Sequence, residues 1–68
     1  MAQRGRRTVG DKIKKFREHR SLSQEELSAI LNISITHMGY LEQNRRVPSL
    51  KLLRKIAKAL KVPAKDLI

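Results

Sequence analysis

The feature that most constrains the fold of this chain is a very short connection between two helical patterns in its middle. Apolar residues at helical spacing predict helices over residues 24–31 and 35–43, with only residues 32–34 between them. Two helices joined this closely must cross at a large angle. Spacing alone leaves an ordinary helical bundle with a short loop as an equally good alternative.

The residues around this connection favour the angled arrangement. Ser23 precedes the first helix, and Glu26 three residues later completes a capping box. Asn32 lies where that helix would end, and asparagine tolerates the left-handed backbone conformation better than most residues. Ser34 is a plausible N-cap for the second helix. Together these residues predict a helix-turn-helix geometry.

Three further helical patterns flank this pair. We expect one helix over residues 11–20, another over residues 49–60, and a last short turn or helix that starts at Val62-Pro63. Leu67 of this last segment is expected to fold back on the core. The apolar stripe of the 49–60 helix is formed by Leu50, Leu53, Ile56, Ala57 and Leu60. We find no strand pattern and no internal repeat. We therefore predict a compact, all-α five-helix bundle over residues 11–68, preceded by a flexible basic arm over residues 1–10.

Length and composition restrict the function classes. With 68 residues the chain has room for one domain. It has no cysteine, which fits a reducing compartment, and no apolar run near the roughly 20 residues that span a bilayer. The first ten residues are too polar for a signal peptide. An enzyme is disfavoured, because there is no Gly-rich phosphate loop and little room for a cleft, and we expect no cofactor.

The charge of the chain points to a polyanionic partner. Sixteen Lys and Arg residues stand against six Asp and Glu residues, which gives a net charge of +10. Such a field attracts polyanions and speeds association with them. Nucleic acid is the first candidate and an anionic membrane surface is the second. A merely soluble basic protein is the alternative that charge alone leaves open.

From Gly10 to Ile68 the chain resembles the Cro and phage-repressor type of helix-turn-helix domain, also called the xenobiotic-response-element family. The matching segments are IKKFR (13–17), LSQEEL (22–27), IS (33–34), YLEQNR (40–45), PSL (48–50) and KIAKAL (55–60). Two departures are Ser28 and Asn32, where the family commonly has alanine and glycine. Gly39, in the middle of the third helix, should cost about 1 kcal/mol relative to alanine.

The resemblance implies a lambda-repressor-like domain that binds double-stranded DNA as a homodimer on a palindromic operator. It implies regulation of transcription, with repression favoured, in the cytoplasm of a bacterium or in a phage context. No membrane and no small-molecule ligand are expected for this segment. The same fold also occurs in antitoxins and transcriptional adaptors, where protein partners matter as much as DNA, and this remains the alternative function.

By the same resemblance, the third helix would lie in the major groove with its N-terminal residues at the base edges. The expected base-reading residues are Ser34, Ile35, Thr36, His37 and Tyr40. Ser34 could equally be a cap alone. His37 could instead reach a phosphate or water, and it has no second ligand at metal-binding spacing.

Backbone contacts would come from both ends of the motif. The expected phosphate-contacting residues are Ser23, Gln24, Asn44, Arg45, Arg46 and Arg17. The resemblance further implies a partly buried ion pair between Arg17 and Glu42 that fixes the first helix against the third. We assign this pair mainly to structure.

The basic residues are unevenly distributed. Residues 21–44 contain no Lys or Arg; eight of the sixteen precede this segment and eight follow it. We hypothesise that the flanks supply affinity, whereas methyl contacts, hydroxyls and DNA shape supply sequence preference. In the arm, Arg4, Arg6 and Arg7 could enter the minor groove or could only add non-specific attraction.

The C-terminal part of the chain carries a cationic face and some apolar residues with no clear place. Its basic residues are Lys51, Arg54, Lys55, Lys58 and Lys61. We interpret them as a solvated face rather than a second DNA contact. The candidates for a dimer seam are Leu52, Val62, Leu67 and Ile68.

Overall fold

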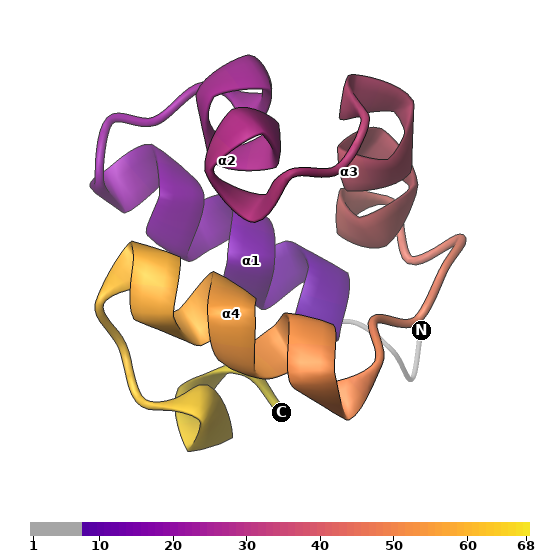
Figure 1. Ribbon diagram of the computed structural model, residues 1–68. Helices are drawn as coiled ribbons and strands as arrows, with labels where there is room; N and C mark the ends of the chain where they lie inside the picture. Colours follow the sequence, from indigo (N-terminus) through magenta and orange to yellow (C-terminus); the bar gives the residue numbers. More distant parts are fainter. Residues whose placement is uncertain (1–7) are drawn as a thin grey trace, which may run out of the picture.

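A computed structural model describes residues 8–68 of the chain, and every regular element in this range is helical (Figure 1). The elements are α1 (Val9–His19), α2 (Gln24–Leu31), α3 (Ile35–Glu42), α4 (Leu50–Leu60) and the 3₁₀ helix η1 (Ala64–Leu67). The all-α prediction holds for this range. No helix within it is long and apolar enough to cross a membrane.

The prediction of five helices is not met, because the described residues form four α-helices and one 3₁₀ turn. In η1 the backbone N–H of Asp66 donates to the carbonyl of Pro63, three residues back, at 2.9 Å. That bonding pattern defines the tighter 3₁₀ turn. It brings Leu67 into the core, where its side chain is fully buried.

Hydroxyl side chains start all four α-helices. Each accepts a hydrogen bond from the backbone N–H three residues later, and these N-caps are Thr8, Ser23, Ser34 and Ser49. The capping box is confirmed, since the Ser23 N–H also donates to the Glu26 carboxylate at 2.8 Å. Such a cap contributes about 1 kcal/mol. Local sequence therefore determines where these helices begin.

The first helix begins earlier than the apolar pattern predicts. α1 starts at Val9, capped by Thr8, so residues 8–10 belong to the folded part rather than to the arm. Gly10 is buried, and its N–H donates to Asn44 Oδ1 at 3.0 Å. A Cβ atom at this position would lie 2.5 Å from the carbonyl oxygen of Leu41. Glycine is required here because the backbone of α1 approaches the C-terminal end of α3 so closely.

The core lies between α1, α2 and α4, and α3 closes one side of it. Its fully buried side chains are Ile13, Leu27, Met38, Leu41, Ile56, Leu60 and Leu67. α3 packs against α1 and α2, while α2 also packs on α4 (Figure 1). Leu50 departs from the prediction, because it is 57% exposed at the first position of α4 and Leu53 is the first residue of the stripe to reach the core.

Candidate nucleic-acid interface

The turn between α2 and α3 has the backbone geometry that its sequence predicts. Asn32 is left-handed, with φ 60° and ψ 44°, and the N–H of Ile33 donates to the carbonyl of Ser28 at 3.0 Å. These bonds cap the C-terminal end of α2. Ser28 is buried, and its hydroxyl donates to the carbonyl of Glu25 at 2.8 Å. The capped turn sets the angle at which α3 leaves α2.

α3 turns one side to the core and the other to solvent. Met38, Leu41 and Glu42 are buried, whereas Ile35 is 49% exposed and Tyr40 37% exposed. Thr36 and Ser34 are exposed as well, and His37 is partly covered. Of the five expected base-reading residues, four are thus exposed and His37 is half-buried. The surface of α3 and its N-cap that these five residues form is the outer strip of α3. The Ser34 hydroxyl already accepts from the His37 N–H at 3.0 Å, so it serves as a cap.

Gly39 interrupts this strip without a packing reason in the protein. A Cβ atom added there would meet only the Gln43 side-chain amide, at 3.9 Å. That distance is ordinary van der Waals contact, so the fold itself does not require glycine at this position. Gly39 thus contrasts with Gly10, where the space is filled by backbone.

A buried ion pair between Arg17 and Glu42 supports the outer strip from the core side of α3. Arg17 is 8% exposed; its Nε donates to Glu42 Oε2 at 2.5 Å and its Nη2 to Oε1 at 3.1 Å. The hydrogen bond to Glu42 raises the pKa of Arg17, burial opposes that rise, and Coulombic attraction to Glu42 adds to it. Removal of either partner would leave an uncompensated buried charge. The pair links α1 to the end of α3, as the family resemblance implies.

Two of the residues expected to contact phosphate, Arg17 and Gln24, both donate hydrogen bonds to Glu42. The Arg17 Nη1 donates to the carbonyl of Leu22 at 2.7 Å, so all three guanidinium nitrogens have a partner within the protein, and a phosphate contact by Arg17 stays a prediction. Gln24 is partly buried, and its Nε2 donates to Glu42 Oε1 at 2.9 Å. Nε2 carries two hydrogens. The ion pair therefore orients the Gln24 side chain and leaves one N–H for an external partner.

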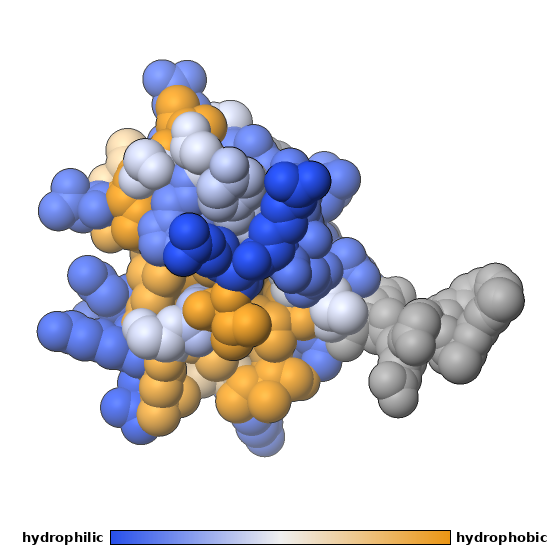
Figure 2. All heavy atoms as spheres, turned by 90° about the vertical axis from the view of Figure 1, so that its right-hand side faces the viewer, coloured by the Kyte–Doolittle hydropathy of each residue, from blue (hydrophilic) through white to orange (hydrophobic). Residues whose placement is uncertain are grey.

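The loop after α3 carries two arginines, Arg45 and Arg46, close to the C-terminal end of that helix. Asn44 has φ 62° and accepts from Gly10 through Oδ1, so its side chain is tied to α1. Arg45 donates its N–H to the carbonyl of Tyr40 at 2.9 Å, and its guanidinium lies 5.9 Å from the centroid of the Tyr40 ring. Arg46 is exposed. On this face of the molecule, strongly hydrophilic side chains lie at the centre, directly above an apolar patch (Figure 2).

The Tyr40–Arg45 contact was missed by the sequence reasoning. The sequence has no Lys or Arg in residues 21–44. The stacking of Arg45 on Tyr40 nevertheless brings a guanidinium over the exposed side of α3. The two residues are five apart and span the helix end, a spacing for which no helical rule predicts contact. Arg4, Arg6 and Arg7 lie outside the described residues; Gly10, near the start of α1, lies beside Asn44.

The four candidates for a dimer seam differ in how deeply their side chains are buried. Leu67 is fully buried in the core of its own chain, which confirms the expectation that it folds back on the core and removes it from the candidates for a dimer seam. Leu52 and Val62 are partly buried against the same core. Ile68 is exposed, and its carbonyl accepts from Lys12 Nζ at 2.6 Å.

Comparison with known proteins matches this architecture. A helix-turn-helix family model matches residues 13–67. The immunity repressor protein of Bacillus phage phi105 is 34% identical over 61 residues, which cover 90% of this chain and 42% of the repressor. The chain thus spans well under half the length of that relative.

Solved structures show the same fold. The restriction-modification controller protein C.AhdI from Aeromonas hydrophila superposes with a TM-score of 0.83 at 28% identity, covering 88% of this chain and 91% of that one. SinR, the master regulator for biofilm formation, solved in complex with DNA, superposes with a TM-score of 0.82 at 26% identity, covering 88% and 97%. The chain therefore belongs to the helix-turn-helix family of DNA-binding transcription regulators of the Cro and phage-repressor type.

Proposed function

We propose that this protein binds double-stranded DNA in a sequence-specific manner and represses transcription, with α3 in the major groove. The observation that carries the proposal is the exposed strip of α3, held at a defined angle by the Asn32 turn and from behind by the Arg17–Glu42 pair. An α-helix fits the major groove, and its N-terminal residues reach the base edges in this class of protein.

Base recognition would come from short and apolar side chains. Ile35 and Thr36 can contact the methyl group of thymine, and the hydroxyls of Ser34 and Thr36 can bond a base edge. His37 and Tyr40 would reach a base or the adjoining phosphate. Because α3 itself contains no Lys or Arg, the commonest contact to guanine is missing from its sequence.

Affinity would come mainly from contacts to the DNA backbone on both sides of α3. Gln24, oriented by Glu42, and Ser23 lie at the start of α2, where free N–H groups and the helix dipole suit a phosphate. Arg45 and Arg46 lie at the other end, with the Asn44 amide beside them. Arg4, Arg6 and Arg7 would extend this cationic flank along the DNA.

We further propose that two copies bind a palindromic operator. In helix-turn-helix dimers the two recognition helices lie about one helical turn of DNA apart, roughly 34–36 Å, so the half-sites repeat at that interval. With Leu67 in the core, the exposed Ile68 and the partly buried Leu52 and Val62 remain as candidates for the seam.

The test is selection of bound sequences from a random DNA pool, followed by titration of the selected duplex at two salt concentrations. We expect enrichment of inverted half-sites and steep loss of affinity as salt rises. Absence of any enriched sequence would refute sequence-specific binding. A strict guanine opposite α3 would leave DNA binding in place. It would refute the hypothesis that the cationic flanks supply affinity while the neutral outer strip of α3 supplies sequence preference.

A further inference from the structure

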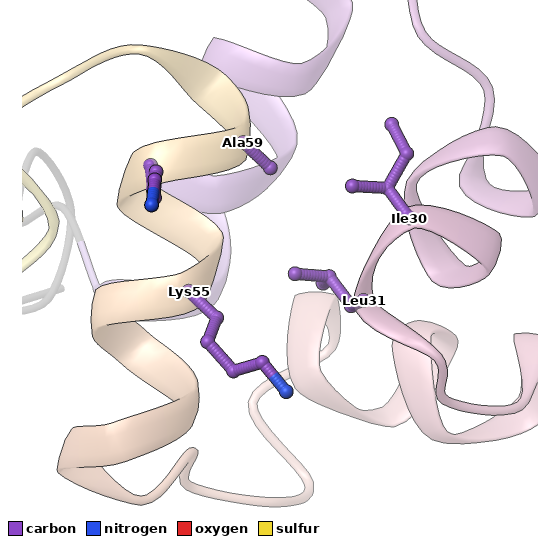
Figure 3. A pocket seen from close by; sticks show the side chains of 5 residues that line it. Ile30, Leu31, Lys55 and Ala59 are labelled. Atoms are coloured by element: carbon purple, nitrogen blue, oxygen red, sulfur yellow. The ribbon is translucent and has the colours of Figure 1, made fainter.

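A groove between α2 and α4 takes no part in the proposed DNA contact. Ile30 and Leu31, at the C-terminal end of α2, form one side, and Lys55 and Ala59 of α4 form the other (Figure 3). Lys58 completes the lining, and the volume of the groove is about 390 Å³. The proposed phosphate contact of α2 is at the opposite end of that helix, and α3 contributes no residue to the lining.

The groove combines an apolar floor with a basic rim. Leu31 is almost fully buried and Ala59 is partly buried, but Ile30 is 58% exposed beside them. The Lys55 side chain extends from α4 toward α2, with its ammonium group at the far end (Figure 3). Its methylene stem can therefore cover apolar surface while the charge stays at the rim. An occupant that buries Ile30 would gain from the hydrophobic effect.

The charge of the rim identifies the kind of occupant. α4 has no acidic residue, and its exposed basic residues are Lys51, Arg54, Lys55 and Lys58. A second copy of this chain would bring the same basic helix, so two α4 helices would repel each other. DNA could neutralise the lysines but would leave Ile30 uncovered. A segment with both aliphatic and acidic side chains complements floor and rim together.

We propose that this groove docks an acidic amphipathic helix of a protein partner. Aliphatic side chains of that helix enter between Ile30 and Ala59, and its carboxylates pair with Lys55 and Lys58. The α4 part of the lining spans residues 55–59, which is little more than one turn, so one or two aliphatic anchors fit. Because α3 is not involved, a partner can dock while the protein is on DNA.

The test uses a synthetic 15-residue helical peptide that carries two leucines four residues apart among glutamates. The control peptide has the same composition with the leucines on opposite faces. Binding is measured by fluorescence anisotropy at 0.15 M salt or above. We expect the amphipathic peptide to bind at least tenfold more tightly than the control, with amide chemical-shift changes confined to the C-terminal end of α2 and to α4.

The decisive variant is Ile30→Lys, which removes the apolar wall and also raises the net charge. If the groove acts as proposed, this variant binds the peptide at least tenfold more weakly despite its added charge. The matched control is Val47→Lys, the same change in charge at a residue that is 88% exposed in the loop before α4. Its affinity for the peptide should equal or exceed that of the unmodified protein. Circular dichroism melts establish that both variants fold.

Four results would overturn the proposal. Equal binding of the two peptides, or undiminished binding by Ile30→Lys, would show that net charge alone attracts the peptide. A tenfold loss of DNA affinity in Ile30→Lys would place the groove in the DNA surface. Loss of a dimer in that variant, seen by sedimentation of the protein alone, would make a second copy the occupant. DNA affinity of the unmodified protein is measured in parallel, so failure of the proposed function is recognised separately.

Discussion

Gly10 and Gly39, which both lie within helices, should respond oppositely to substitution by alanine. In an exposed helical position, alanine stabilises a helix by roughly 0.5–1 kcal/mol relative to glycine, because it loses less backbone entropy on folding. At Gly39 the added methyl meets only the Gln43 amide at 3.9 Å, so the full gain should appear. For a domain of this size, 1 kcal/mol raises the melting temperature by roughly 4–8 °C.

At Gly10 the same methyl has no space. It would lie 2.5 Å from the carbonyl oxygen of Leu41, 2.8 Å from that of Glu42 and 2.7 Å from Asn44 Oδ1. Two of these atoms are backbone, so α1 and α3 must separate. Overpacking of this kind costs about 1–3 kcal/mol, and the Gly10–Asn44 hydrogen bond contributes about 1 kcal/mol more. After the gain in helix propensity is subtracted, Gly10→Ala should lose about 2 kcal/mol.

The assay is urea and thermal unfolding of both variants beside the unmodified protein. A stabilised Gly10→Ala variant would refute the close approach of α1 to the end of α3. DNA affinity of Gly39→Ala adds a second readout. If this variant gains stability but loses DNA affinity, the glycine is needed for close approach to DNA; unchanged affinity would show that the position is unconstrained.

Three further predictions concern the Arg17–Glu42 ion pair, the Asn32 turn and the outer strip of α3. Glu42→Leu should destabilise the protein by about 3–5 kcal/mol because Arg17 is left buried and unpaired, whereas the double variant with Arg17→Met should recover most of that loss in urea unfolding. Asn32→Val should lose about 1–2 kcal/mol because the left-handed conformation penalises a β-branched residue, and Asn32→Gly should change stability by less than about 0.5 kcal/mol; equal effects would contradict the role of φ. Ile35→Ala should weaken binding to the selected duplex by about 1 kcal/mol without loss of stability, and the loss should vanish on a duplex in which uracil replaces the contacted thymine.

Local features of this protein were predictable from its sequence. The capping box at Ser23, the left-handed Asn32 and the cap at Ser34 all depend on residues within four positions of each other. The bounds of α2 came out as predicted for the same reason, and α3 ended within one residue of its predicted end. Short-range hydrogen bonds and side-chain periodicity determine these features, and both are visible in a linear pattern.

Features that join distant parts of the chain were decided by the tertiary structure. Gly10 meets Asn44, 34 residues away, and this contact places the start of α1 earlier than its apolar pattern indicates. Leu50 belongs to the apolar stripe of α4 but remains exposed at the first position of the helix, whereas the other members of the stripe are buried. Periodicity says which side chains share a face but not which face another helix covers.

The candidate nucleic-acid interface likewise combines features that the sequence predicted with contacts that only the tertiary structure decided. The motif named its residues, and the family resemblance implied the Arg17–Glu42 pair. Two other contacts were not predicted: Gln24 also donates to Glu42, and Arg45 stacks on Tyr40. Hydrogen bonds of buried polar groups are satisfied by whichever atoms packing brings near. The angled helix pair at residues 24–43 was thus determined by the sequence, whereas the donors that remain free to contact DNA were decided by the packing around it.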